Sequence, residues 1–416
     1  MKIYGKDLSE VLAEMPWQFK VIVMAGMIWI PFALIHAVYI FATIGKSISK
    51  PGIVNFAASP VNAGVADPSM TEGPDKKTIY MALTMITRQA DAKNPAEGRW
   101  SPSIRLASSN SPCKLWNDMG EAIASEQQEI IGPDGVTPLD SAGVWWLEHP
   151  ALIHDPTDPN PIGEYKLFYY KYLWLGPDDK SKQLSRRYWM IAFRHTNNPV
   201  LKDWKDEQWI FGGRGPTAED PFGAPPEPYG SLVQYHLNDF DPSLKDMFFY
   251  ARPSAAVVDG VIYMTLSAFF KDDNTPNRVI MVSSADHART WHYVGTLLTK
   301  EDVAKMGPYT KLGGGSLIQK KGKLYFAAVL GDDKVLGLGS FIIPFEDASK
   351  ALLKKDQKTG APAVINKISR VSVQPTLEGG GYAAYSDLCK GLYVSEFSGL
   401  KKNFHIFSTQ KDPVEQ

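Results

Sequence analysis

The chain contains very little cysteine: among its 416 residues only Cys113 and Cys389 are present. Neither belongs to a C-x-x-C pair, so the spacing of a structural zinc site is missing and we expect no metal. Positive and negative charge also nearly cancel, with 44 Lys and Arg against 45 Asp and Glu. Such a chain lacks the basic field that nucleic-acid binding requires, so we expect no nucleic-acid partner.

Common cofactor and nucleophile motifs are absent as well. The sequence has no P-loop, no G-x-G-x-x-G, no H-E-x-x-H and no G-x-S-x-G. It is rich instead in aromatic and turn-forming residues, with 11 Trp, 18 Tyr and 19 Phe beside 34 Gly and 30 Pro. This balance favours short strands joined by turns, so we expect an all-β fold.

One long apolar run stands near the start of the chain: Val21 to Ile44 contains no charged residue. A helix of this length measures about 36 Å, enough to cross a hydrocarbon core of about 30 Å. We therefore predict an uncleaved transmembrane helix at 21–44, preceded by an amphipathic interfacial segment at 1–20. The usual single-span arrangement places the remaining chain on the periplasmic side of a bacterial inner membrane.

His36 lies inside this apolar run, and an ionisable residue within a membrane span is a functional candidate by default. The string A-L-I-H-A-V-Y-I-F-A-T around it resembles the histidine segment of bacterial light-harvesting antenna helices. That resemblance implies bacteriochlorophyll ligation by His36. The alternative, which we favour, is a neutral histidine that faces a partner helix or a water at headgroup level, with no cofactor. Integral membrane proteins are then the expected partners.

From about residue 60 onward the sequence repeats a phrase of an apolar strand, a turn and an aromatic strand. Five copies of the opening strand share this pattern: V-A-D-P-S-M (65–70), L-E-H-P-A-L-I-H-D (147–155), A-R-P-S-A-A-V-V-D-G (251–260), G-G-G-S-L-I-Q-K-K-G (313–322) and V-Q-P-T-L-E-G-G-G (373–381). Self-similarity on this scale is typical of propellers, and about 70 residues per copy suit four-stranded blades. We predict a five-bladed β-propeller at 65–410, between a linker at 45–64 and a tail at 411–416.

The two cysteines fall in the first and fifth predicted blades, which are neighbours when the ring closes. A disulfide between Cys113 and Cys389 would latch the ring in an oxidising compartment. Two unrelated buried thiols are the alternative.

The repeated phrases resemble the five-bladed propellers of glycoside hydrolase family 43. In that family the first blade carries A-D-P with a general-base Asp, and the second carries W-A-P. The third carries I-D-P, whose Asp tunes the acid, and the fourth carries E-G-P, whose Glu is the general acid. The A-D-P at Asp67 matches, so the resemblance implies that Asp67 is a general base. Arg252 replaces the modulating Asp, and no Glu stands at Leu312 to Gly315.

W-L-E-H-P, 146–150, stands near the W-A-P position. We expect Glu148 to be a second candidate catalytic carboxylate, and Trp146, His149 and Arg252 to bind ligand around a central pocket. Structural roles stay open, because Asp67-Pro68 also suits a strand-entry turn and Glu148 and His149 also suit a satisfied polar core. Several aromatic residues suit either sugar stacking or the core between blades: Trp145, Trp146, Tyr169, Tyr172 and Trp174.

Hydrolysis with inversion requires both a base carboxylate and a protonated acid. Because the motif comparison supplies only the base, the first hypothesis is a non-catalytic, membrane-anchored propeller that serves as a binding or scaffold subunit of a membrane protein complex. The alternative is a cell-surface glycoside hydrolase that acts on furanosides with Asp67 as general base, and therefore binds carbohydrate.

Overall fold

The structure is a computed structural model, and it describes residues 2–3, 6–7, 54–55, 64–89, 99–110, 116–129, 143–174, 188–201, 203–205, 207–213, 232–271, 273–320, 322–332, 339–369, 382–387, 391–396 and 403–407. The chain divides into two compact units, residues 1–50 and 51–416. In the first unit, β1 (Lys2–Ile3) pairs with β2 (Lys6–Asp7) in an antiparallel ladder.

Several expectations fall outside these described residues: the apolar run at 21–44 with His36, and both Cys113 and Cys389. Among the residues that are described, no helix has the length and apolar character needed to cross a membrane.

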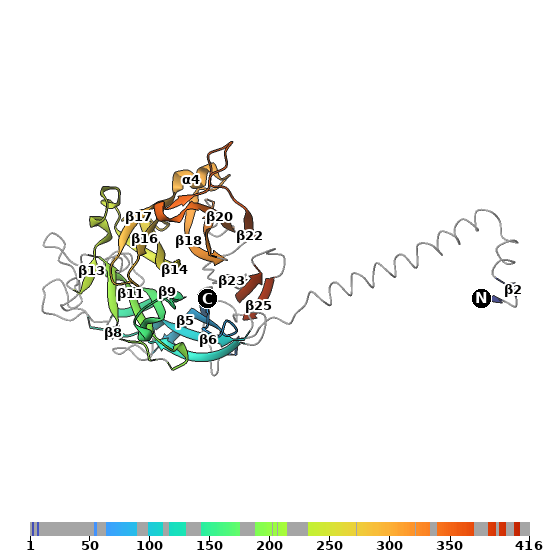
Figure 1. Cartoon of the computed structure of the whole chain (residues 1–416), viewed down its shortest axis with the longest axis horizontal. Coiled ribbons are helices and arrows are strands. Elements are labelled where there is room, and N and C mark those ends of the chain that lie inside the picture. Colours follow the sequence, from blue (N-terminus) through green and yellow to red (C-terminus); the bar gives the residue numbers. More distant parts are fainter. Residues whose placement is uncertain are drawn as a thin grey trace. The chain divides into compact units, whose positions relative to one another are not determined.

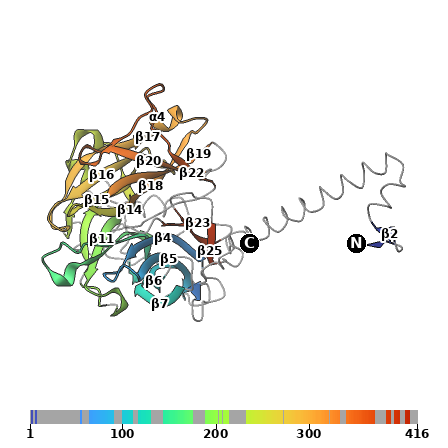
Figure 2. The same ribbon diagram turned by 45° about the vertical axis from the view of Figure 1, so that its right-hand side comes forward.

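Residues 51–416 form an all-β propeller, whose antiparallel sheets succeed one another around a centre (Figure 1). The first blade runs from the inside outward as β4 (Gly64–Glu72), β5 (Ile79–Gln89), β6 (Arg99–Ser109) and β7 (Trp116–Ile123), with β3 (Val54–Asn55) parallel to β7. Figure 2 shows these four strands in that order. The second blade contains β9 (Gly143–His154), β10 (Tyr165–Trp174), β11 (Trp189–Thr196) and β12 (Gln208–Gly212), flanked by β8 (Gln127–Gln128) and β13 (Val233–Tyr235).

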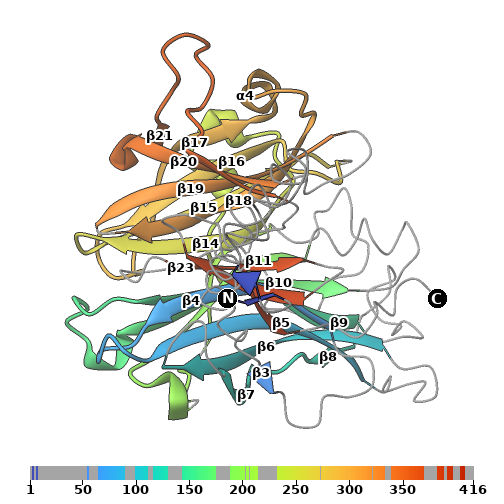
Figure 3. The ribbon, with the colours of Figure 1, turned by 90° about the vertical axis from the view of Figure 1, so that its right-hand side faces the viewer.

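The third blade contains β14 (Phe249–Val258), β15 (Val261–Phe269), β16 (Arg278–Ser284) and β17 (His292–Thr299). The fourth contains β18 (Lys311–Lys320), β19 (Lys323–Gly331) and β20 (Gly339–Asp347), and β20 also pairs with β21 (Leu352–Leu353) and β22 (Asn366–Ser369). Short helices connect the strands: α4 (Lys300–Lys305), η1 (Pro161–Gly163), η2 (Pro199–Leu201), η3 (Leu237–Asp239), η4 (Pro242–Leu244) and η5 (Ala348–Lys350). In Figure 3 the fourth blade and the first blade lie on opposite sides of the ring.

The predicted number of blades is corrected from five to four. Each of the four blades above has at least four strands, whereas the remaining sheet has three: β23 (Tyr382–Asp387), β24 (Gly391–Glu396) and β25 (Asn403–Phe407). The fifth opening phrase, 373–381, lies outside the described residues, so this sheet has no described counterpart of β4. Its strand β23 packs against β4 of the first blade.

The core lies between the blades, which explains why strands such as β10 carry large apolar side chains on both faces. Phe168 and Tyr170 on one face of β10 join the core shared with the third blade, while Leu167 and Tyr169 on the other face join the core shared with the first. Successive side chains of a strand point to opposite faces, so a blade covered on both sides buries every residue. The alternation expected of half-buried strands is therefore lost here.

Candidate active site

The innermost strands of the four blades share one irregularity, a β-bulge. The register of each strand against its neighbour shifts at one point, in β4, β9, β14 and β18 alike. One residue at each shift has a positive φ: Asp67 (50°), His149 (52°), Arg252 (58°) and Gly314 (91°). Positive φ is uncommon outside glycine, and bulges re-aim side chains, often beside functional sites. The repeated phrase thus places one re-aimed residue per blade at the centre.

The recurring triplets D-P-S, H-P-A, R-P-S and G-G-S each begin with the positive-φ residue of a bulge. Proline has no N–H, so within a sheet it is tolerated at a bulge. The serine that follows links neighbouring blades: Ser69 Oγ accepts from the Leu152 backbone N–H at 2.8 Å, and Ser254 Oγ accepts from Leu317 N–H at 3.0 Å. The sequence pattern therefore encodes both the bulge and the contact to the next blade.

Asp67 is held in place by two neighbouring side chains. Its Oδ1 lies 3.0 Å from His149 Nδ1, and its Oδ2 accepts a hydrogen bond from Thr84 Oγ1 at 3.1 Å. Thr84 Oγ1 in turn accepts from the His149 backbone N–H at 3.2 Å. Burial raises the pKa of Asp67, but His149, the charge of Arg252 and the Thr84 hydrogen bond together outweigh it, so the pKa lies below its ordinary 3.8. Asp67 is ionised at neutral pH.

Glu148 precedes the bulge residue of β9 and has the opposite character. Burial is the main cause that raises the pKa of Glu148 to about 7, and the negative charge of Asp67 adds to it. The charges of His149 and Arg252 and a hydrogen bond from Tyr172 act in the other direction without reversing the shift. Burial also raises the pKa of Tyr172 well above 10, so its hydroxyl stays a donor. Glu148 therefore carries a proton near neutral pH.

Arg252 reaches from the third blade toward the fourth. Its guanidinium donates a hydrogen bond to the carbonyl oxygen of Gly313. A Cβ on Gly314 would lie 3.4 Å from Arg252 Cδ and only 2.5 Å from Ser267 Oγ, so glycine leaves the room that this approach needs. Burial lowers the pKa of Arg252 and the nearby Asp67 and Glu148 oppose this effect, but an arginine keeps its charge.

The candidate sugar-stacking aromatics separate into two groups. Trp146 stacks on Trp174 with ring centroids 4.7 Å apart and tilts against Tyr172 at 5.7 Å, and all three side chains are only half-buried. Trp145 and Tyr169 instead belong to the core between the first and second blades. The first group stands beside Glu148 through the Tyr172 hydroxyl and forms the apolar wall of the site.

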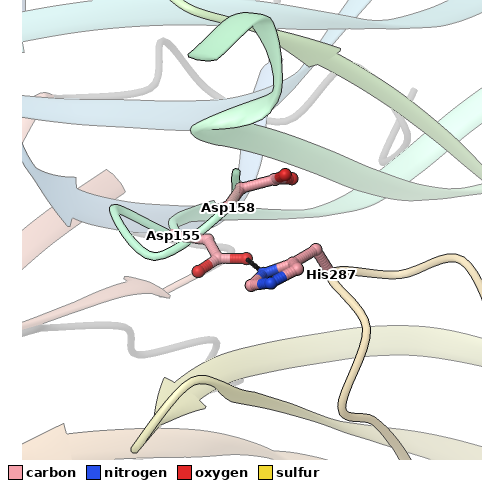
Figure 4. Close-up of side chains that lie close together, drawn as sticks. All are labelled: Asp155, Asp158 and His287. Atoms are coloured by element: carbon pink, nitrogen blue, oxygen red, sulfur yellow. Dashed lines mark hydrogen bonds and ion pairs between the residues drawn. The ribbon is translucent and has the colours of Figure 1, made fainter. Parts of the chain in front are cut away.

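A second charged cluster lies between the second and third blades, away from the bulges (Figure 4). Asp155, which follows β9, contacts His287 of the β16–β17 turn, with Oδ2 2.9 Å from Nδ1. The Lys166 ammonium lies 3.1 Å from Asp155 Oδ2, 2.7 Å from Asp158 Oδ2 and 2.6 Å from the Gly163 carbonyl oxygen. Both carboxylates thus already face a buried cation, and a divalent metal there would meet the Lys166 charge.

The structure brings together most of the candidate residues that the sequence suggested. Asp67, Glu148, His149 and Arg252 share one electrostatic environment, and Trp146 flanks it. Sequence reasoning missed Thr84, which comes from the second strand of the first blade. It also placed the fourth phrase less accurately, since Gly314 is the bulge equivalent of Asp67. The serine two residues beyond the positive-φ residue in the first, third and fourth blades, Ser69, Ser254 and Ser316, was the signal that would have fixed this register.

No protein-family model matches the chain, and no curated protein matches it. Among solved structures it is similar to Zg3597, a family 117 glycoside hydrolase from the marine bacterium Zobellia galactanivorans, with 10% identity and a TM-score of 0.43 over 81% of this chain and 82% of that one. It is similar to a Penicillium chrysogenum α-L-arabinanase, with 11% identity and a TM-score of 0.39 over 84% and 83%. It is also similar to the Hadza microbial sialidase Hz136, with 9% identity and a TM-score of 0.45 over 83% of this chain and 59% of that chain. Similarities of this size carry no information on activity, which therefore has to come from the site.

Proposed function

We propose that the protein is a glycoside hydrolase in which Asp67 is the general base and Glu148 the general acid. The observation that supports this is a pair of neighbouring carboxyl groups whose pKa values are displaced in opposite directions, that of Asp67 below 3.8 and that of Glu148 to about 7. Environments that separate two carboxyl pKa values in this way define an acid and a base at one pH. Glycosidic bond hydrolysis is the reaction that uses such a pair.

Each residue of the site has a role in this reaction. Protonated Glu148 donates its proton to the leaving-group oxygen while ionised Asp67 accepts a proton from the attacking water. His149 Nδ1 and Thr84 Oγ1 hold the two Asp67 oxygens and so orient the base. Trp146 and Trp174 offer a half-buried apolar surface on which a sugar ring can stack.

The hypothesis of a non-catalytic scaffold started from the missing glutamate in the fourth blade. Glu148 supplies a carboxyl group from the second blade instead, in the residue directly before its bulge. Arg252 lowers the pKa of this carboxyl, as expected for a cation at the modulator position, but burial and Asp67 more than offset that effect. The glycoside hydrolase alternative therefore becomes the leading proposal.

The test is turnover of a panel of aryl furanosides and pyranosides by the full chain and by Asp67→Asn and Glu148→Gln. We expect kcat/KM to fall by about 10²- to 10⁴-fold in Asp67→Asn, the usual contribution of a general base, and by less in Glu148→Gln, because an aryl leaving group needs little protonation. Asp246→Asn, at an exposed carboxylate before β14, is the matched control and should retain full activity. Turnover that survives Asp67→Asn, or a wild-type chain without activity on the whole panel, would contradict the proposal.

A further inference from the structure

The guanidinium of Arg252 uses few of its hydrogen-bond donors. A guanidinium has five N–H donors in a fixed planar fork, and the Gly313 carbonyl oxygen takes one of them. Asp67 and Glu148 act on Arg252 through charge alone, and among the described residues neither makes a hydrogen bond or ion pair to it. Among the described residues, the site therefore holds a half-buried cation with few of its donors occupied.

Two other arginines of the described chain, Arg105 and Arg194, have carboxylate partners, whereas Arg278 resembles Arg252 in donating to one backbone carbonyl oxygen, that of Ser243. Arg105 donates hydrogen bonds from Nε and NH2 to the two carboxylate oxygens of Asp118. Arg194 contacts the Glu207 carboxylate and the Tyr169 hydroxyl. Each of these has a carboxylate partner within its own blade. Arg252 is half-buried, so part of its hydration is lost, and a carboxylate from a ligand would replace it.

Two further donors of the site lack partners among the described residues. Ser267 Oγ is buried without a hydrogen bond, and it borders the same glycine that borders Arg252. The indole Nε1 of Trp146, on the aromatic wall, is likewise buried and unpaired. Meanwhile the two Asp67 oxygens are already satisfied by His149 and Thr84, so this carboxylate is not free to turn toward Arg252.

We propose that Arg252 binds the carboxylate of an acidic sugar, so that the substrates are uronosides rather than neutral glycosides. This inference rests on the proposed function for its catalytic half, while the binding half stands on the geometry above. A planar carboxylate matches the guanidinium fork and accepts two parallel hydrogen bonds from it. With Gly313 holding one edge of the fork, the remaining edge presents donors to a ligand beside the carboxyl pair.

The experiment measures binding of free sugars to the full chain by titration calorimetry. The probes are D-galacturonate and D-glucuronate, each compared with its methyl ester, which keeps the shape and removes the charge. We expect the acid to bind at least about tenfold more tightly than the ester, as hydrogen bonds to a charged group imply. This wild-type comparison requires no substitution, so a folding defect cannot obscure it.

Two variants then assign the preference to one side chain. Arg252→Met should bind acid and ester equally, and Arg252→Lys should keep only part of the preference, because an ammonium is a point charge without a fork. Equal binding of acid and ester by the wild-type chain would overturn the proposal, as would a preference that survives Arg252→Met. Tighter binding of galactose 6-sulfate than of galacturonate would overturn the carboxylate assignment.

The same measurement separates this inference from the proposed hydrolysis. Glu148→Gln should slow hydrolysis of alkyl glycosides by about 10²- to 10⁴-fold but keep the preference for the acid over the ester. Selective uronate binding without cleavage of any glycoside would support the anion site and contradict the hydrolase. Cleavage of neutral glycosides without uronate preference would do the reverse.

Discussion

The central site at the bulges and the outer cluster around Lys166 both bury charge, but they pair it differently. In the outer cluster the ammonium of Lys166, 1% exposed, touches Asp155 and Asp158, and the pKa of both carboxyls lies below the ordinary value. In the central site Arg252 touches no described carboxylate, and the pKa of Glu148 is raised to about 7. Charged side chains that are fully paired with one another stabilise the fold, whereas charged side chains with few partners are available to react or to bind a ligand.

The largest expected effect tests Glu148, the proposed general acid. In Glu148→Gln, we expect kcat/KM for alkyl glycosides to fall by about 10²- to 10⁴-fold, since a poor leaving group needs protonation. Nitrophenyl glycosides, whose leaving group needs little protonation, should lose far less. Steady-state kinetics across a series of leaving groups measures the difference. A uniform loss over the series would show that Glu148 does not act as the acid.

The next effect concerns the paired charges of the outer cluster. Lys166→Met removes the shared cation and leaves Asp155 and Asp158 facing each other in a buried place. We expect the free energy of unfolding to fall by about 3–5 kcal/mol, the usual cost of breaking a buried pair by removing one partner. Urea unfolding followed by tryptophan fluorescence measures this loss.

The control for Lys166→Met is Lys205→Met, because Lys205 pairs with Asp203 at 2.7 Å on the surface. Exposed pairs contribute about 0–1 kcal/mol, so this variant should differ little from the wild type. Equal losses of unfolding free energy in the two variants would show that the buried and the exposed ion pair stabilise this protein to the same extent.

The pH dependence of stability should also have opposite signs in the two regions. The pKa of Glu148 is raised from 4.5 to about 7 on folding, so its stabilisation is complete below 4.5 and is lost as the pH rises through about 7. Relative to Glu148→Gln, the wild type should lose up to about 3 kcal/mol between pH 4.5 and 8. The lowered pKa of Asp155 acts in reverse, since its stabilisation is lost as the pH falls below 3.8. Urea unfolding at a series of pH values measures both, and a flat difference for Glu148→Gln would contradict its raised pKa.

The sequence alone located the innermost strands because their signal is local. Four opening phrases coincide with β4, β9, β14 and β18, and the A-D-P phrase led directly to Asp67. Glu148 was harder to recognise as a candidate acid, since its raised pKa depends on burial and on the charge of Asp67, which is distant along the chain. The outer cluster gave no signal at all, because Asp155 and His287 stand 132 residues apart.

Register was the other quantity that single-sequence reasoning could not supply. The fourth phrase was aligned on its glycines as a group, although only Gly314 has the backbone angle of Asp67, His149 and Arg252. A bulge inserts one residue on one strand, and that insertion becomes visible once the partner strand is known. Motif comparison therefore looked for the missing glutamate in the fourth blade and gave less weight to Glu148, which precedes the bulge of the second.

The smallest expected effect tests how closely Arg252 depends on the glycine beside it. Gly314→Ala places a Cβ at φ +91°, 2.5 Å from Ser267 Oγ, whereas Gly322→Ala at φ +71° meets nothing within 4 Å. Gly322→Ala should cost about 1 kcal/mol of unfolding free energy for backbone strain alone, and Gly314→Ala about 1–2 kcal/mol more because Ser267 must also move. Only Gly314→Ala should weaken uronate binding, since its Cβ lies against Arg252 Cδ at 3.4 Å. Equal stability losses with unchanged binding in both variants would show that Arg252 is positioned independently of Gly314, and the anion site would then depend on the Gly313 carbonyl contact alone.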